Sequence, residues 1–194
     1  MTKPTILVTG AKGQLGQSFQ QFAEKYTAWQ FQFLDIDEMD ITDREAVIAY
    51  FKNNKVDWCI NCAAYAAVDR AETETETAER VNVVGAKNLA EACAAQSATL
   101  IHFSTDYVYH SAQNLPDRET DRVEPKGAYA RTKLAGDLAV LAANPQSMVL
   151  RTSWLFAPYG HNFVRTILRF GAEQSSLNVV NDQLGSPTYA PDLA

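Results

Sequence analysis

The sequence predicts a doubly wound α/β fold, with a mostly parallel sheet covered by helices on both faces. Two observations support this prediction. Short apolar runs alternate with longer segments in which apolar residues recur every three or four positions, which is the pattern of βαβ units. The first apolar run passes directly into a glycine-rich turn and then into a helical segment, as expected at the start of such a fold.

Each element follows from a local pattern. Strands are expected at the short apolar runs, residues 5–9, 31–36, 56–63, 99–104 and 148–151. Amphipathic helices are expected at residues 14–26, 43–53, 76–96 and 127–142. Thr42 or Asp43 can cap the second helix with its side-chain oxygen. The residues between the fourth strand and the last helix, 111–124, are expected to be irregular.

Charge and composition argue against several classes of partner. The net charge is −6 and the pI is about 5.1, which disfavours nucleic acid or an anionic membrane surface as the main partner. The chain has no run of about 18 apolar residues, which a membrane-spanning helix would need. Because the first residues also lack a signal-peptide pattern, a cytoplasmic location is expected.

The three cysteines predict neither a disulfide framework nor a metal site. Cys59 and Cys62 have C-x-x-C spacing, but they lie in a run that we interpret as a buried strand. Residues i and i+3 of a strand face opposite sides, so the two thiols would point apart. There is no second thiol pair, and no histidine has a metal-ligand partner at a useful spacing.

The turn after the first strand predicts a phosphate site for a dinucleotide, and hence a Rossmann-type fold. It carries the spacing G-x-x-G-x-x-G. Glycines permit a tight turn, close approach of the backbone to a pyrophosphate and close helix–sheet packing, while the helix N-terminus attracts the anion. The residues expected to contact the cofactor here are Gly10, Lys12, Gly13, Gln14, Leu15 and Gly16.

The end of the second strand bears on the choice between NADH and NADPH. Asp35 lies there, and a carboxylate at this place would bond the adenosine ribose 2′-hydroxyl and repel a 2′-phosphate. Lys12 argues the other way, because its ammonium could meet that phosphate, so both cofactors stay open. Further cofactor contacts are expected at Asp40 and Ile41, and at the end of the third strand at Ala63, Ala64 and Tyr65.

A proton-transfer site is predicted where the fourth strand ends and the last helix begins. Thr105 ends that strand, and ligands of open α/β sheets bind beyond the carboxyl ends of the strands. Tyr129 and Lys133 lie one helical turn apart, and a nearby cation lowers the pKa of a phenol. We therefore expect Tyr129 to donate a proton, Lys133 to lower the pKa of Tyr129, and Thr105 to form a hydrogen bond with a substrate oxygen.

Several motifs together resemble the extended short-chain dehydrogenase/reductase family. They are the three glycines, Asn61-Cys62-Ala63-Ala64, Ser104-Thr105-Asp106-Tyr107-Val108 and Tyr129-x-x-x-Lys133. Four further runs are similar in particular to the dTDP-4-dehydrorhamnose reductases of that family, namely Lys133-Leu134-Ala135-Gly136, Arg151-Thr152-Ser153-Trp154, Asn162-Phe163 and Asn181-Asp182-Gln183-Leu184-Gly185-Ser186-Pro187-Thr188.

That resemblance implies NAD(P)H-dependent reduction of the 4-keto group of dTDP-4-dehydro-β-L-rhamnose to dTDP-L-rhamnose, a step in cell-surface polysaccharide biosynthesis. It implies that Tyr129 protonates O4, that Lys133 also holds the nicotinamide ribose, and that Asp106 and Trp154 line the sugar site. It further implies a cofactor-binding domain at residues 1–155 and the incomplete start of a smaller substrate lobe at 156–194. The expected partner is a dTDP-sugar, and a second copy in a homodimer is an open expectation.

Two alternatives stay open. A non-catalytic, reductase-like regulatory subunit would keep the fold, although the intact Thr/Tyr/Lys set argues against it. Another nucleotide-sugar epimerase or reductase would share most of the motifs, whereas a dehydratase is expected to carry Asp-Glu where this chain has Asp106-Tyr107. The chain departs from the family pattern at His110-Ser111 and at Asp137, where the family usually has Glu.

Overall fold

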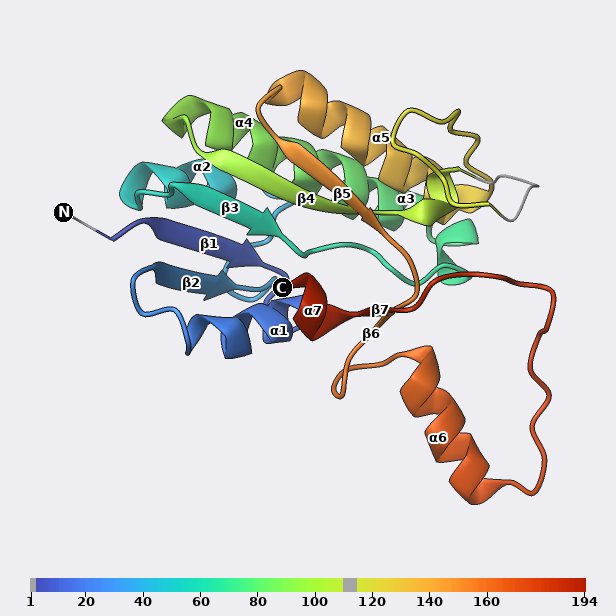
Figure 1. Cartoon of the computed structure of the whole chain (residues 1–194). Helices are drawn as coiled ribbons and strands as arrows, with labels where there is room; N and C mark the ends of the chain where they lie inside the picture. The colour runs from blue at the N-terminus through green and yellow to red at the C-terminus, as the bar shows by residue number, and fades with distance from the viewer. Residues whose placement is uncertain (1–2, 110–114) are drawn as a thin grey trace.

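A five-stranded parallel sheet forms the centre of the molecule (Figure 1). The computed structural model describes residues 3–109 and 115–194, so His110 and Ser111 lie outside the described residues. The strands, in the spatial order β2-β1-β3-β4-β5, are β1 (Thr5–Thr9), β2 (Gln30–Leu34), β3 (Trp58–Asn61), β4 (Thr99–Thr105) and β5 (Met148–Thr152). Because all neighbouring pairs are parallel, every strand ends at the same edge. The predicted fold class is confirmed.

Helices cover the two faces of the sheet unequally. One face carries α2 (Arg44–Asn53), α4 (Ala86–Gln96) and α5 (Gly127–Ala143), and the other carries α1 (Gln14–Ala23) and the short α7 (Ala190–Leu193) (Figure 1). Asp43 caps α2 as predicted, since its carboxylate accepts hydrogen bonds from the backbone N–H groups of Glu45 and Ala46.

The strands divide their side chains between two hydrophobic layers. Leu7 of β1 packs in the layer beneath α2, α4 and α5, whereas Ile6 and Val8 pack in the layer that contains α1. This alternation is the period of two that a strand buried on both faces must show. Cys59 and Cys62 also fall in the two different layers, which confirms that the two thiols face opposite sides of the sheet.

The helix predicted at residues 76–96 consists of three consecutive parts. These are α3 (Thr75–Glu79), a π-helical segment (Arg80–Gly85) and α4. Asn82 lies in the π-helical segment, where its side-chain amide bonds Tyr65 and Thr132. The spacing of apolar residues does not predict such a widened turn, because the turn is stabilised by contacts with residues distant in sequence. The first helix also ends earlier than predicted, at Ala23.

Residues 155–194 add a two-stranded parallel ribbon and two helices. β6 (Leu155–Phe156) pairs with β7 (Thr188–Tyr189), and α7 then packs against α1 with Ala190 fully buried. Between the two strands, α6 (Phe163–Glu173) has no buried residue and projects away from the sheet (Figure 1). The division of the chain at residue 155 stays a prediction.

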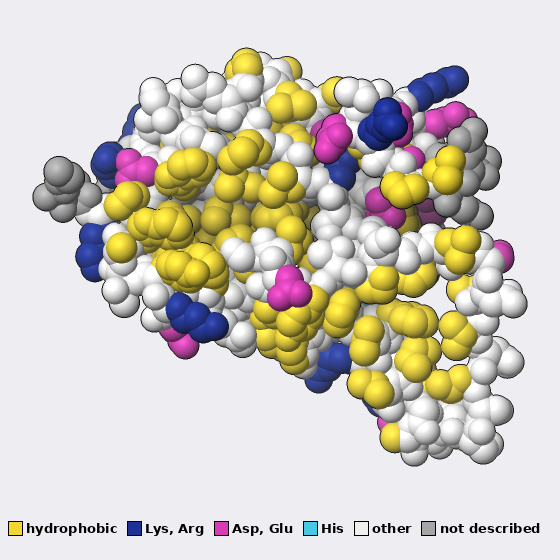
Figure 2. Space-filling view, in the orientation of Figure 1, with side chains coloured by type: hydrophobic (Ala, Val, Ile, Leu, Met, Phe, Trp, Pro, Cys, Tyr) yellow, Lys and Arg dark blue, Asp and Glu magenta, His cyan; other side chains and the backbone are white. Residues whose placement is uncertain are grey.

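Apolar side chains gather over the strands on the face that carries α1 (Figure 2). Trp58, Met148 and Leu150 are 40%, 42% and 41% exposed, so α1 and α7 cover the β1 side of this face more fully than the β5 side. Within residues 3–109 and 115–194, none of the helices has both the length and the apolar character that crossing a bilayer requires.

Candidate active site

The glycine-rich turn has the geometry that a bound pyrophosphate requires. Gly10 has φ +67°, and a Cβ added to it would lie 2.5 Å from the backbone N of Ala63. A Cβ on Gly16 would lie 2.3 Å from the carbonyl oxygen of Gly10, so both positions need glycine. Gly13 caps α1 without a side-chain hydrogen bond, which leaves the first N–H groups of the helix available to an anion.

The carboxylate of Asp35 and the side chain of Lys12 lie near each other beside this turn. One Asp35 oxygen accepts a hydrogen bond from the backbone N–H of Lys12 at 2.7 Å, and the other accepts from the N–H of Ile36 at 2.9 Å. The Lys12 side chain is exposed and forms an ion pair with Asp37, whose hydrogen bond raises the pKa of Lys12. An anionic and a cationic group therefore stand together where the adenosine ribose was predicted.

The other residues predicted to contact the cofactor differ in burial and in hydrogen bonding. Asp40 forms a turn, with its side chain accepting from the N–H of Thr42, and the side chain of Ile41 is buried in the core. Ala63 and Ala64 follow β3 at the edge of the sheet, and the Ala63 N–H donates to the Asn61 side chain. The buried Asn82 fixes Tyr65 by bonding both its backbone N–H and its carbonyl group, a contact that the sequence did not indicate.

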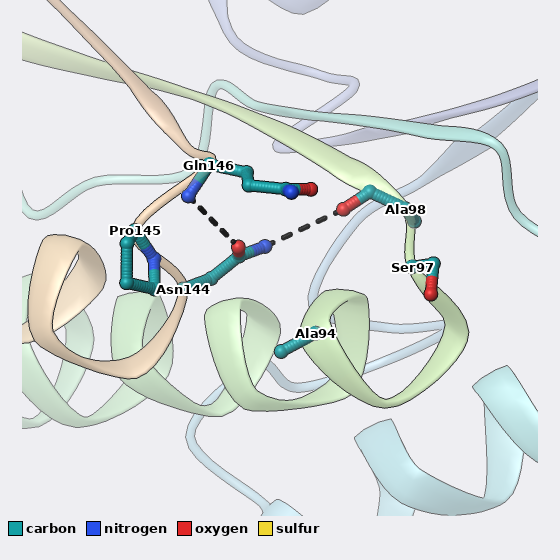
Figure 3. Close-up of a pocket in the computed structure, with 6 residues that line it drawn as sticks. All are labelled: Ala94, Ser97, Ala98, Asn144, Pro145 and Gln146. Carbon is teal, nitrogen blue, oxygen red and sulfur yellow. Dashed lines mark hydrogen bonds between the residues drawn. The ribbon is translucent and has the colours of Figure 1, made fainter.

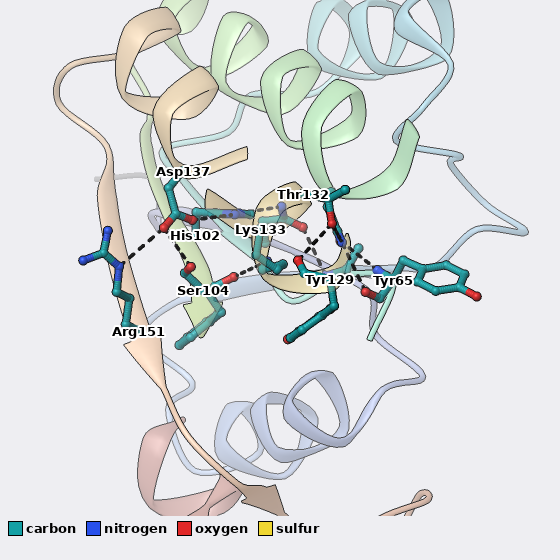
Figure 4. Close-up of polar contacts among 12 residues, drawn as sticks. Tyr65, His102, Ser104, Tyr129, Thr132, Lys133, Asp137 and Arg151 are labelled. Carbon is teal, nitrogen blue, oxygen red and sulfur yellow. Dashed lines mark hydrogen bonds and ion pairs between the residues drawn. The ribbon is translucent and has the colours of Figure 1, made fainter. Parts of the chain in front are cut away.

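Thr105, Tyr129 and Lys133 lie where β4 ends and α5 begins. Thr105 and Lys133 are 5% and 2% exposed, and Tyr129 is half-buried. The Thr105 hydroxyl donates to Asp106 at 3.3 Å, and the Lys133 ammonium donates to the carbonyl oxygen of Phe103 at 2.7 Å (Figure 4). The fold thus brings a hydroxyl, a phenol and an ammonium from two elements to the edge of the sheet where ligands bind.

The predicted lowering of the Tyr129 pKa by Lys133 is wrong. Burial raises the pKa of Tyr129, and the nearby Asp106, Tyr107 and Asp137 raise it further, while the interaction with the Thr105 side chain acts in the opposite direction. The ammonium of Lys133 is directed to a strand carbonyl, so desolvation of the phenolate dominates.

Glu72 caps the start of α5 from a different part of the chain. Its carboxylate accepts a hydrogen bond from the backbone N–H of Ala128 at 2.6 Å, whereas the N-cap residue Lys126 supplies no side-chain bond. A carboxylate at this place satisfies a free helix N–H and complements the helix dipole. Ala128, the residue that precedes Tyr129, is thereby anchored. No sequence pattern indicates this contact.

The two residues predicted to line the sugar site lie at the ends of different strands. Asp106 follows β4, and burial raises the pKa of its carboxyl group. Trp154 follows β5, is 40% exposed and has φ +45°. The segment before β7 lies against Trp154, because the Thr188 N–H donates to the Trp154 carbonyl and a Cβ on Gly185 would lie 2.5 Å from its indole ring.

A hollow lies at the opposite edge of the sheet (Figure 3). It is lined by Ala94, Ser97, Ala98, Asn144, Pro145 and Gln146. Asn144 crosses it and donates to the carbonyl of Ala98, at the amino end of β4. Since ligands of parallel sheets bind beyond the carboxyl ends of the strands, the predicted active-site residues, and not this hollow, form the candidate site.

Comparison with known proteins agrees with this geometry. A family model described as the RmlD substrate binding domain matches residues 4–194. The chain belongs to this family. It is 41% identical over 189 residues to a dTDP-4-dehydrorhamnose reductase from Aggregatibacter actinomycetemcomitans, and 46% identical over 192 residues to one from Mycolicibacterium smegmatis. These alignments cover 97% of this chain but only 64% and 57% of the two relatives.

Solved structures of the RmlD family have the same architecture. The dTDP-4-dehydrorhamnose reductase of Clostridium acetobutylicum superposes with a TM-score of 0.94 at 40% identity, covering 97% of this chain and 67% of the other. That of Bacillus anthracis, in complex with NADP, superposes with a TM-score of 0.95 at 36% identity, covering 99% of this chain and 68% of the other. The resemblance to dTDP-4-dehydrorhamnose reductases that the sequence motifs indicate is confirmed.

Proposed function

We propose that this chain binds a reduced nicotinamide cofactor and donates the proton in the reduction of dTDP-4-dehydro-β-L-rhamnose to dTDP-L-rhamnose. The observation that carries the proposal is the joint placement of Thr105, Tyr129 and Lys133 at the sheet edge that also holds the glycine turn. Relatives 41% and 46% identical to this chain are named for this reaction, which supports the choice of substrate.

The glycine turn fits a dinucleotide cofactor. Its backbone approaches Ala63 too closely for any side chain at Gly10, and the first turn of α1 has no side-chain cap, so N–H groups are available for a pyrophosphate. Of the two cofactors, we favour NADPH, because the Bacillus anthracis relative is in complex with NADP and the Lys12 side chain is exposed. A bound nicotinamide would supply a hydride to the substrate carbonyl carbon.

Tyr129 is suited to be the proton donor. Because its pKa is raised, the phenol keeps its proton at neutral pH and can transfer it to the oxygen that becomes an alkoxide. The Thr105 hydroxyl would bond the same oxygen and hold it near the phenol. Lys133 would orient the cofactor ribose with the N–H groups that do not bond Phe103, and Asp106 and Trp154 would contact the sugar.

Two measurements on the 194-residue chain test the proposal. The first is titration with NADPH and with NADH, followed by cofactor fluorescence; the second is cofactor oxidation in the presence of dTDP-4-dehydrorhamnose. We expect NADPH to bind more tightly, and Lys12→Ala to remove that preference while leaving NADH binding unchanged. Failure to bind either cofactor would refute the proposal.

The outcome of the oxidation assay separates the alternatives. Oxidation that requires the dTDP-sugar supports the reductase. Because the chain spans 57% to 64% of the length of the relatives described above, the assay is repeated with a chain continued by the C-terminal segment of the Mycolicibacterium smegmatis relative. Cofactor binding without turnover in both proteins would favour the non-catalytic subunit. The homodimer and the cytoplasmic location stay predictions, the first to be tested by light scattering.

A further inference from the structure

A row of buried polar side chains crosses the sheet beneath the proposed proton-transfer site. Asn61 at the end of β3, His102 in β4 and Asp137 in α5 are each 1% exposed. The Asn61 amide nitrogen lies 3.0 Å from His102 Nδ1, and His102 Nε2 lies 3.8 Å from Asp137 Oδ1 (Figure 4). The sequence assigned no role to His102 and singled out Asp137 only as a departure from the family pattern.

The hydrogen bonds in this row have a fixed direction. The Thr9 hydroxyl and the Ala63 backbone N–H both donate to the Asn61 side-chain oxygen, so the Asn61 nitrogen must point to His102. That nitrogen can only donate, which makes Nδ1 of His102 the acceptor and leaves the hydrogen of the neutral ring on Nε2. Burial and the charge of Lys133 lower the pKa of His102 well below its usual value, so the ring is neutral at physiological pH.

The Nε2–H of His102 therefore faces the carboxylate of Asp137. At 3.8 Å the two atoms do not form a hydrogen bond, and neither has a hydrogen-bond partner among the described residues. The second carboxylate oxygen accepts from the Ser104 hydroxyl at 2.8 Å and lies 3.5 Å from Arg151 Nε. Burial raises the pKa of Asp137, whereas Ser104, Lys133 and Arg151 act in the opposite direction.

Lys133 lies one helical turn before Asp137 on α5. Lys133 is buried, and its ammonium donates a hydrogen bond to the carbonyl oxygen of Phe103. The charged and titratable groups around the pair come from α5 itself, with Tyr129, from β4, with His102, and from β5, with Arg151. Burial lowers the pKa of Lys133 to about 8, and Asp137 opposes that effect.

We propose that Asp137, buried one helical turn from Lys133, is the counter-ion that keeps Lys133 protonated, with its carboxylate held by the Ser104 hydroxyl. The inference deepens the proposed function, on which the catalytic meaning of Lys133 rests. The row runs from the end of β3, where the cofactor is expected to pass, to Asp137 on α5. A carboxylate paired with Arg151 for stability alone would not control the protonation of Lys133.

The test is a direct titration of Lys133 by NMR in the protein labelled with ¹³C-lysine, with the signal assigned by its loss in Lys133→Arg. We expect Asp137→Asn to lower the titration midpoint by about one pH unit or more, as removal of a close opposite charge does. Asp137→Glu should restore the midpoint. Asp182→Asn, which changes an exposed carboxylate outside α5 and the sheet, is the matched control and should leave the midpoint unchanged.

A second variant removes the carboxylate in another way. Asp137→Ser leaves a small polar side chain on α5, so the titration midpoint of Lys133 should fall as it does in Asp137→Asn. An unchanged midpoint in folded Asp137→Asn would overturn the proposal, and so would an unchanged midpoint in Asp137→Ser should Asp137→Asn not fold. Neither measurement requires turnover, so the result is independent of whether the proposed reductase activity is found.

Discussion

Gly136 lies where α5 packs against the π-helical segment with no room for a side chain, and its substitution by alanine should destabilise the protein. A Cβ at this position would lie 2.1 Å from the carbonyl oxygen of Asn82 and 3.1 Å from its carbonyl carbon. Neither backbone can move freely, because the Asn82 side chain bonds the Tyr65 backbone and the Thr132 hydroxyl. The added methyl group must therefore displace a packed helix.

The expected magnitude follows from two opposing effects. Replacing glycine by alanine inside a helix favours folding by about 1 kcal/mol. Forcing extra volume into a packed interior costs about 1–3 kcal/mol, and a contact of 2.1 Å with backbone belongs at or beyond the upper end of that range. We expect a net loss of about 2 kcal/mol, which lowers the Tm by roughly 4–8 °C for a chain of this size.

Gly171 in α6 provides a matched control. It also lies within a helix, but a Cβ there would have no atom within 4 Å, so Gly171→Ala should raise stability by up to about 1 kcal/mol. Urea denaturation followed by circular dichroism measures both variants. The reasoning is refuted if Gly136→Ala is as stable as the parent, or if the two substitutions change the free energy of unfolding in the same direction.

Three further predictions concern the cap of α2, the buried lysine and the proton donor. Asp43→Ala removes the cap of α2 and should cost about 1 kcal/mol of unfolding free energy, whereas Asp43→Asn should keep most of it; equal losses in urea denaturation would contradict this. The folded-state pKa of Lys133 is lowered to about 8, so the unfolded chain binds more protons between about pH 8 and pH 10.5. Lys133 should therefore make the free energy of unfolding rise by at most about 1.4 kcal/mol per pH unit across that window, and the same pH series on Lys133→Met should lack this contribution. Tyr129→Phe should lower turnover by about 10²–10⁴-fold with cofactor binding retained. The control Tyr26→Phe, which changes an exposed tyrosine after α1, should leave turnover unchanged. Wild-type turnover by Tyr129→Phe would refute the role of Tyr129 as proton donor.

The features predicted correctly from the sequence are those encoded by neighbouring residues. The short apolar run that contains Ile6, Leu7 and Val8 predicted β1, and the glycine spacing predicted the turn that Gly10 and Gly16 form. The cap at Asp43 was also local. The Tyr129 pKa was predicted in the wrong direction, because the spacing of Tyr129 and Lys133 says nothing about desolvation, which decides it.

Sequence alone thus determined the class of fold, the edge of the sheet that holds the candidate site, and the hydroxyl, phenol and ammonium of Thr105, Tyr129 and Lys133 proposed to act there. Only the tertiary structure decided what surrounds them: Glu72 at the start of α5, Asn82 at Tyr65, and the row from Asn61 through His102 to Asp137. The physical reason is that strand period, turn geometry and helix capping depend on residues close in sequence. Burial and charge pairing depend on residues that folding brings together from separate elements, and these set the protonation of Tyr129 and Lys133.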